Sequence, residues 1–278
     1  MDCRKWLNKY STDCKLKYNS ESTVLNYVSC VNVFLSHFIK YREPKEIPTQ
    51  EIKDWLLEAN TINTRKHRLC AIKSFYELSV GMPSKISKIP YPRSEKKLPI
   101  VLSKDEIQRM FDVCENKKHK VILGLLYSCG LRVSELINLK WCHIDRSRMI
   151  INVVAAKGKK DRQVMLAESI IKLLEDYWKE YKPVEYVLNG QFGLQYSDRS
   201  VGQVIKQLAK AAGIKKPVWT HLIRHCSFTH MVEAGIDINL IQRLAGHNSP
   251  KTTAIYTHIS DNLISRIQSP ISSIRFIG

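Results

Sequence analysis

The chain has 278 residues, with 44 lysines and arginines against 26 aspartates and glutamates, and a formal net charge of +18. Hydrophobic residues make up 44% and charged residues 25%, which is the composition of a folded protein and excludes a disordered chain. No segment approaches the roughly 18 consecutive apolar residues of a membrane span, and residues 1–10 lack the apolar core of a secretory signal, so we expect a cytoplasmic protein with no membrane partner.

The positive charge is spread along the chain. Residues 1–98 carry 18 basic and 10 acidic residues, and residues 99–278 carry 26 and 16. Because both parts are basic, a polyanion that touches both is favoured over one held by a single basic tail, and nucleic acid is the expected partner. The alternative, an anionic membrane surface, requires a helix with a continuous Lys/Arg face opposite bulky apolar residues, and no such helix is evident.

Residues 1–82 have the pattern of a small helical domain. From Ser22 onward, apolar residues recur at steps of three and four, which predicts an amphipathic helix: Val24, Tyr27, Val28, Val31, Phe34, Leu35 and Phe38. Thr49 is expected to cap a short helix, and a third helix is expected over Thr61–Val80. Basic residues near the start of this third helix are expected to contact the DNA backbone: Arg65, Lys66 and Arg68.

A linker is expected over residues 83–98, between this domain and a second one over residues 99–278. Pro83, Pro90 and Pro92 lie along the segment, which is rich in lysine and has few apolar residues to anchor it. Prolines oppose a helix and the charge opposes a buried core, so the domain boundary is predicted here.

The second domain is predicted to be helical with one small sheet. Ser103 and Glu106 have the spacing of a capping box, an apolar helix covers roughly residues 119–128, and Gly130 ends it. Two β-prone runs flank a hairpin turn at Lys157-Gly158, over residues 149–154 and 162–166. Helical patterns then return over residues 168–181, 200–212, 220–234, 238–244 and 251–258. The predicted fold class is mainly α with a small antiparallel β-sheet.

Arg132 and Glu135 open a helix directly after the break at Gly130, and their spacing of three residues puts them on one helix face. A helix start offers free backbone N–H groups, and a guanidinium beside them suits a bound phosphate. An ordinary surface ion pair explains the same spacing, so this pair alone does not decide between the two.

A second cluster consists of His221, Arg224 and His225, which lie at positions i, i+3 and i+4 of a predicted helix. This spacing places imidazole and guanidinium groups on one face. A zinc site on the two histidines would need a third ligand, and usually a glutamate between them, and neither lies nearby. The eight cysteines contain no Cys-x-x-Cys pair that would supply it.

Tyr256 follows His247 by nine residues. An unperturbed tyrosine has a pKa of roughly 10, so its phenol attacks at neutral pH only beside a base or a strong positive field. Arginines that neutralise a phosphate, histidine and lysine that move protons, and a phenol that attacks are together an inventory for phosphoryl transfer without a metal. The sequence holds such a set in Arg132, Lys157, His221, Arg224, His247 and Tyr256.

With these motifs the chain resembles a tyrosine recombinase of the phage integrase family, in its compact Xer-like form. The segments that carry the resemblance occur in the family's order: Gly130–Leu136, Ala156–Gly158, His221–His225 and Ala245–His258. The resemblance implies that residues 99–278 form the α+β catalytic domain of that family. It also implies that residues 1–82 form its helical, SAM-like core-binding domain, which contacts DNA.

For the reacting groups, the resemblance implies that Arg132 and Arg224 hold the scissile phosphate while Tyr256 attacks it. The products are a 3′-phosphotyrosyl bond and a free 5′ hydroxyl. Lys157 would protonate the leaving 5′ oxygen, and His221 would assist proton transfer at the tyrosine. Neither ATP, a metal nor another cofactor is required, because the energy of the cleaved bond is kept in the covalent link.

Other residues would support this reaction. His247 would donate a hydrogen bond to the phosphate, and Glu135 would orient the residues of the site. Lys159 and Lys160 follow the hairpin lysine and are expected to contact the DNA. The expected assembly is a homotetramer on synapsed double-stranded DNA sites, and the need for a second recombinase or an accessory protein stays open.

The predicted function is site-specific DNA recombination, in DNA integration and excision or in the resolution of chromosome dimers. One alternative is a type IB topoisomerase, which uses similar chemistry but relaxes DNA without exchanging partners. That class usually has lysine where His221 stands, and the helical first domain favours a recombinase. A DNA-binding protein with an inactive site is the other alternative, although every expected catalytic residue is present.

Overall fold

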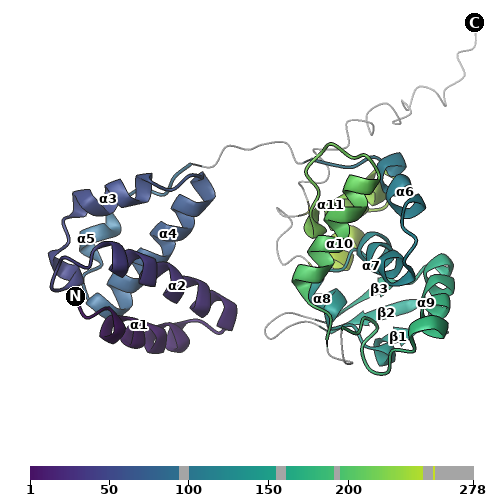
Figure 1. The fold of residues 1–278 in the computed structure, drawn as a ribbon, viewed down its shortest axis with the longest axis horizontal. Helices are drawn as coiled ribbons and strands as arrows, with labels where there is room; N and C mark the ends of the chain where they lie inside the picture. The colour runs from purple at the N-terminus through teal and green to yellow at the C-terminus, as the bar shows by residue number, and fades with distance from the viewer. Residues whose placement is uncertain (94–99, 155–160, 191–194, 247–252, 254–278) are drawn as a thin grey trace, which may run out of the picture. The chain divides into compact units, whose positions relative to one another are not determined.

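The structure, a computed structural model, describes residues 1–93, 100–154, 161–190, 195–246 and 253. The chain divides into two compact units, Met1–Lys97 and Leu98–Gly278 (Figure 1). Each unit contains a hydrophobic core built from its own residues. Across the described ranges, no helix is long and apolar enough to cross a membrane.

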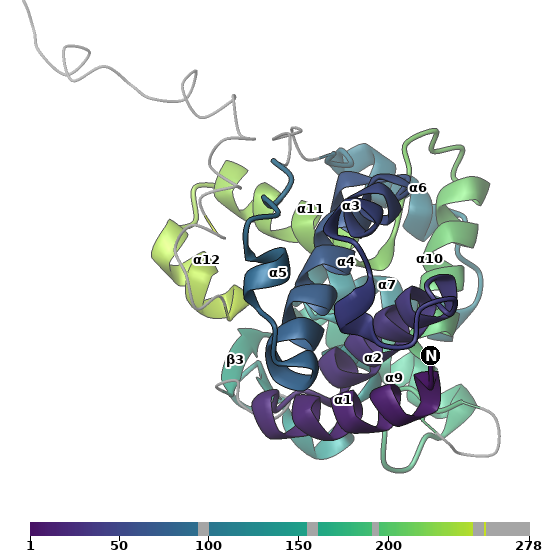
Figure 2. The ribbon, with the colours of Figure 1, turned by 90° about the vertical axis from the view of Figure 1, so that its left-hand side faces the viewer.

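The first unit is helical. Its elements are α1 (Cys3–Lys17), α2 (Glu21–His37), η1 (Pro44–Glu46), α3 (Thr49–Leu57), α4 (Ile62–Phe75), the π-helical turn η2 (Tyr76–Val80) and α5 (Ser84–Ser87). Helix α1 packs against α2 and η2, and α4 packs against α2 and α3 (Figure 2, which faces this unit). Val31, Phe34 and Leu35 of the predicted apolar stripe are fully buried, which confirms the amphipathic helix.

Three local features of this unit differ from the sequence-based expectations. Helix α1 lies outside the predicted helices, and it buries only Tyr10 and Cys14, too short a stripe to give a clear period. Thr49 does not cap α3, because Pro48 precedes the helix and the Thr49 hydroxyl donates to the Lys85 carbonyl at 3.4 Å.

The third difference concerns the predicted linker. Helix α5 forms inside residues 83–98, and Ile86 and Ile89 are buried in the core of the first unit. The expectation of no helix here is wrong because proline opposes a helix interior but not its start, and Pro83 precedes α5 with a φ of −61°. The first unit therefore extends to at least Ile89.

The second unit begins with α6 (Lys104–Asp112) and the predicted capping box is confirmed. The Ser103 hydroxyl accepts from the Glu106 N–H at 3.1 Å, and the Glu106 carboxylate accepts from the Ser103 N–H at 2.8 Å. Helix α7 (Lys117–Ser128) follows and packs against α9 (Glu168–Tyr181) and α11 (Thr220–Glu233). Gly130 lies two residues after the end of α7 and has a φ of +57°. A Cβ atom at this position would lie 2.5 Å from the Phe228 ring.

The predicted small sheet is confirmed and has three antiparallel strands in the order β1-β2-β3. The strands are β1 (Ile144–Asp145), β2 (Ile150–Val153) and β3 (Arg162–Met165). The 3-10 turn η3 (Trp141–His143) directly precedes β1. In β2 and β3, Ile151 pairs with Val164, and Val153 pairs with Arg162. Because paired residues share a face, Arg162 lies on the same side of the sheet as three buried aliphatic residues, Ile151, Val153 and Val164. The hairpin turn at residues 155–160 lies outside the described residues.

The remaining helices are α8 (Val133–Ile137), α10 (Asp198–Ala211) and α12 (Ile238–Ala245). Helix α12 packs against α11 and β3, and Figure 2 shows it beside β3. It ends at Ala245, and Gly246 caps it with a φ of +60°. The helix predicted over residues 251–258 lies outside the described residues except for Thr253, which is helical. The start of α8, β3, α11 and the end of α12 are the elements that build the site.

Candidate active site

Glu135 is the centre of the site. Its carboxylate accepts the Arg132 backbone N–H at 2.8 Å and the Arg132 guanidinium at 2.7 Å. The two residues lie at the start of α8, so the predicted pairing at a spacing of three is confirmed. The Glu135 side chain is only 7% exposed, and this burial rules out an ordinary surface ion pair.

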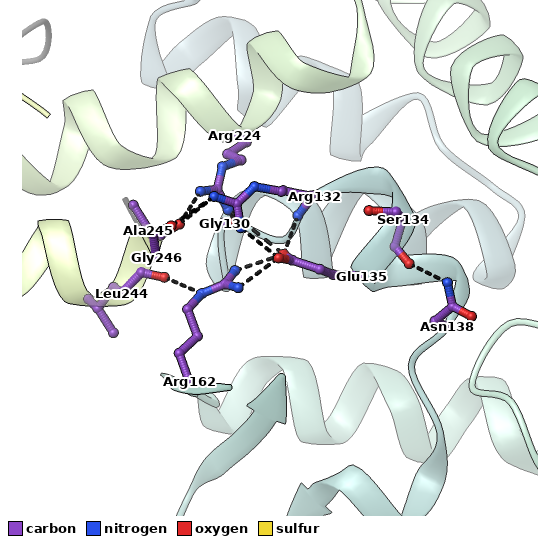
Figure 3. A network of polar contacts seen from close by, with 10 residues as sticks. All are labelled: Gly130, Arg132, Ser134, Glu135, Asn138, Arg162, Arg224, Leu244, Ala245 and Gly246. Atoms are coloured by element: carbon purple, nitrogen blue, oxygen red, sulfur yellow. Dashed lines mark hydrogen bonds and ion pairs between the residues drawn. The ribbon is translucent and has the colours of Figure 1, made fainter. Parts of the chain in front are cut away.

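Arg162 approaches the same carboxylate from β3 (Figure 3). Its two terminal nitrogens donate to the two Glu135 oxygens, each at 2.7 Å, in a bidentate pair. Its Nε donates to the Leu244 carbonyl at 2.7 Å. The Arg162 side chain is as buried as that of Glu135. Strand β3 is thereby joined both to α8 and to the end of α12.

Arg224 comes from α11 and is 1% exposed. Its Nη1 donates to the Gly130 carbonyl and lies 3.9 Å from the Glu135 carboxylate. The guanidinium carbon lies 4.8 Å from the centre of the Phe228 ring, within the range of a cation–π contact. The absent side chain at Gly130 allows this arrangement, since a Cβ atom there would collide with Phe228.

The guanidinium groups of Arg132 and Arg224 converge on one oxygen atom. The Ala245 carbonyl, at the end of α12, accepts Arg132 Nη2 at 3.0 Å and Arg224 Nη2 at 2.5 Å. Arg132 Nη2 also donates to the Gly246 carbonyl at 3.1 Å. Two guanidinium groups that reach the same acceptor from different elements can together hold one anionic oxygen of a ligand.

The site has excess positive charge. Burial acts to raise the pKa of Glu135, but hydrogen bonds from Arg162, the Arg132 N–H and the Arg132 side chain outweigh it and lower the pKa to about 2. One ionised carboxylate therefore faces three arginines at neutral pH. The remaining positive charge in a largely buried setting favours an anion such as phosphate.

His221 and His225 lie one turn apart on α11, with ring centres 4.5 Å apart in an edge-to-face arrangement. Burial, His221 and Arg224 lower the pKa of His225 to about 4. The pKa of His221, an exposed residue, is also lowered, first by partial desolvation of its ring and then by Arg224 and Arg132. A lowered pKa keeps His221 neutral at pH 7, so its ring can accept a proton. Within the described ranges, no three His, Cys, Asp or Glu side chains are grouped to hold a metal ion.

The predicted site residues are only partly brought together. Arg132, Glu135 and Arg224 meet near the end of α12. His221 lies three residues before Arg224 on α11. Five others fall in the hairpin turn or after Gly246 and lie outside the described residues: Lys157, Lys159, Lys160, His247 and Tyr256.

The basic residues predicted near the start of α4 belong to the first unit. Lys66 is exposed. The Arg68 guanidinium donates to the Trp55 carbonyl at 3.0 Å and lies 4.3 Å from the centre of the Trp55 ring. Arg65 is half-buried. Arg68 therefore has a packing role in its own domain, which the charge pattern alone does not reveal.

Arg162 is the residue of the site that the sequence analysis misses. The signal was the alternation along β3, because Val164 in the strand and Leu166 directly after it are apolar and buried, so that Arg162 falls on the same inward-facing side. An arginine at an inward position of a strand requires a buried partner. That partner, Glu135, is 27 residues away in the sequence, and no local pattern connects the two.

Comparisons with known proteins agree with this geometry. Residues 101–262 match the phage integrase family, and residues 6–86 match the phage integrase N-terminal SAM-like domain. Tyrosine recombinase XerA of Pyrococcus horikoshii is 31% identical over 262 residues, covering 91% of this chain and 89% of that protein. A crystal structure of XerA recombinase is 29% identical with a TM-score of 0.57, covering 94% of this chain and 96% of that one.

A lambda integrase tetramer bound to a Holliday junction has the same fold, with a TM-score of 0.75 at 18% identity, covering 91% of this chain and 76% of that one. The family match over residues 101–262 spans more than half of the chain and includes every element that brings an arginine to Glu135. The chain therefore belongs to the phage integrase family and is a tyrosine recombinase.

Proposed function

We propose that this chain cleaves and rejoins DNA strands at a specific site, with Tyr256 as the nucleophile and Arg132 and Arg224 as the phosphate clamp. The observation that carries the proposal is the convergence of both guanidinium groups on the Ala245 carbonyl. A non-bridging phosphate oxygen is an acceptor of the same kind, with a full negative charge that a carbonyl lacks. Glu135 keeps the two guanidinium groups in place beforehand.

In this mechanism the Tyr256 oxygen forms a bond to phosphorus as the bond from phosphorus to the 5′ oxygen breaks. The phenol proton passes to a base, for which the neutral His221 is suited. Lys157 gives its proton to the leaving 5′ oxygen, so the products are a 3′-phosphotyrosyl bond and a 5′ hydroxyl. A 5′ hydroxyl from a partner strand reverses these steps and joins the new strand. The arginines stabilise the added negative charge at the phosphorus centre.

The test uses a duplex that carries the chain's binding sequence, selected from a random duplex pool with the Tyr256→Phe variant, which we expect to keep DNA binding. A nick placed beside the cleavage point releases a short fragment and traps the enzyme on the strand. We expect a covalent protein–DNA complex that forms in excess EDTA and resists denaturing gel electrophoresis. A chain that binds this duplex and leaves it uncleaved would be a DNA-binding protein, and relaxation of supercoiled plasmid without strand exchange would identify a topoisomerase.

DNA binding is expected to depend strongly on salt. The charge excess of +8 in residues 1–98 and +10 in residues 99–278 favours contacts to phosphates from both units, and each contact releases condensed counterions. We expect the affinity to fall on the order of a thousandfold between about 50 and about 200 mM salt, which corresponds to roughly six neutralised phosphates. Titrations with the Tyr256→Phe variant measure this without cleavage. An affinity that stays constant over this range would contradict the electrostatic contribution.

The segment after Asn262 is proposed to connect neighbouring subunits in a homotetramer on synapsed DNA. It lies outside the described residues, and its sequence is too apolar to be exposed to water as a whole: Leu263, Ile264, Ile267, Ile271, Ile274, Phe276 and Ile277. Pro270 interrupts any single long helix. The lambda integrase tetramer supports an assembly of this kind. The alternative is that the segment packs on its own domain.

Truncation after Asn262 is expected to leave a monomer that binds a single site but assembles on paired sites without cooperativity, because the contact between subunits is removed. Gel-shift titrations on single and paired sites measure the change, and a recombination assay measures its consequence. Unchanged cooperativity together with full recombination would place the segment in its own subunit.

A further inference from the structure

We propose that Arg162 is a positioning residue of the active site, which acts through Glu135 to hold the Arg132 and Arg224 guanidinium groups where they converge. The proposal rests on the proposed function, since it assigns these two arginines to the phosphate. The three guanidinium nitrogens of Arg162 donate to Glu135 and to the Leu244 carbonyl, so Arg162 is connected to the clamp through Glu135.

The geometry makes Arg162 the main support of Glu135 from outside α8 and its cap. It supplies two of the hydrogen bonds to the carboxylate, one to each oxygen. Arg132, three residues before Glu135 in the chain, supplies two as well, through its backbone N–H and its guanidinium, whereas Arg224 lies at 3.9 Å. A carboxylate that is 7% exposed has little water to replace a lost partner. Without Arg162, the carboxylate would keep its hydrogen bonds from Arg132 but lose those from β3, so Glu135 and the Arg132 guanidinium could shift together.

Arg162 also joins Glu135 to the end of α12. The guanidinium that donates to Glu135 also donates through Nε to the Leu244 carbonyl. Leu244 is one residue before Ala245, whose carbonyl accepts from the clamp. Gly246 leaves the space for this crossing, because a Cβ atom there would lie 3.0 Å from Arg162 Cδ. One planar side chain thus sets the distance between the start of α8 and the end of α12 (Figure 3).

A lysine cannot replace this function fully. A guanidinium presents several donors in one plane and reaches both carboxylate oxygens and a carbonyl at once, whereas an ammonium is a point charge without that fork. Arg162→Lys should therefore keep the charge balance of the buried site but lose its geometry. This separates the positioning role from a general need for positive charge.

The experiment measures covalent-complex formation on the nicked, selected duplex and binding of the same duplex. For Arg162→Gln we expect cleavage slowed on the order of a hundredfold, as for a small misplacement of reacting groups. Binding should stay within about threefold of the unchanged chain, because the change leaves the phosphate-binding arginines present. For Arg162→Lys we expect cleavage slowed about tenfold. Arg146→Gln is the matched control, because Arg146 pairs with Glu175 at an exposed position of the same unit.

A double-variant cycle tests whether Arg162 acts through Glu135. If it does, Arg162→Gln and Glu135→Gln remove the same connection, and the double variant should cleave about as slowly as the slower single variant. Rates that fall by the product of the two single effects would overturn the proposal. Cleavage by Arg162→Gln within threefold of the unchanged chain would also overturn it, as would a loss of binding equal to the loss of cleavage, which indicates a structural role only.

Two further outcomes are decided by the same measurements. If Arg162→Gln does not fold, as judged by its thermal melting, the cycle is run with Arg162→Lys, and the same additivity criterion applies. If the unchanged chain forms no covalent complex on a duplex that it binds, the proposed function fails first. If only the positioning role of Arg162 is wrong, the unchanged chain forms the covalent complex and the Arg162 variants form it at the same rate.

Discussion

Replacing Tyr256 with phenylalanine is expected to abolish the covalent protein–DNA complex. The change removes one oxygen and little volume, and that oxygen is the atom proposed to attack the phosphate, for which phenylalanine has no substitute. Binding of the selected duplex should stay nearly unchanged, because the affinity comes from contacts to phosphates and bases rather than from the nucleophile. Denaturing gels of the nicked duplex measure the first effect and gel shifts the second.

The controls are two other tyrosines of the second unit. The Tyr127 hydroxyl lies 2.8 Å from His230 Nδ1, and burial raises the pKa of Tyr127, which makes this phenol a poor nucleophile. Burial likewise raises the pKa of Tyr196. Tyr127→Phe and Tyr196→Phe should therefore still form the complex. A complex that persists in Tyr256→Phe and disappears in one of these two variants would identify a different nucleophile.

Replacing Arg132 or Arg224 with alanine is expected to slow cleavage on the order of a hundredfold or more, as the loss of a preorganised charge at a transition state does. The two should differ in their effects on stability. The Arg132 side chain is 22% exposed, so its removal leaves a site that water can enter. Arg224 is 1% exposed, and its removal leaves the Gly130 carbonyl without this donor in a buried position.

Thermal melting of both variants and the variant Arg224→Lys separates catalysis from stability. Arg224→Lys keeps a positive charge in the buried position but cannot bridge the Gly130 and Ala245 carbonyls as the guanidinium does. We expect it to melt closer to the unchanged chain than Arg224→Ala and to cleave slowly all the same. Cleavage within threefold of the unchanged chain in Arg132→Ala or Arg224→Ala would remove that residue from the proposed clamp.

The elements that the sequence predicts well are those specified by residues close together in the chain. The capping box of Ser103 and Glu106, the stripe of α2 and the pairing of β2 with β3 are all confirmed. Each depends on neighbours within one or two helical turns or across one hairpin. The errors arise where local rules leave two outcomes open, as at Pro83, which a helix accepts at its start and rejects in its interior.

The sequence by itself determined the family and the chemical groups that we propose to act on DNA. The spacing of Arg132 and Glu135 and the order of the motifs in residues 130–258 identify the family, because each motif is a short run of the chain. The pair of His221 and Arg224 on one helix face follows from helical periodicity alone. Charge likewise needs only a count of residues, and it predicts a polyanionic partner.

Only the tertiary structure decided how these groups are held. The contacts of Arg162 with Glu135 and Leu244 span 27 and 82 residues, and that of Arg132 with Ala245 spans 113. No local pattern encodes such contacts, because they exist only once β3 and the end of α12 pack beside the start of α8. The physical reason is burial: three arginines and one glutamate share a setting with little water, where each charge must find its partner in the protein itself.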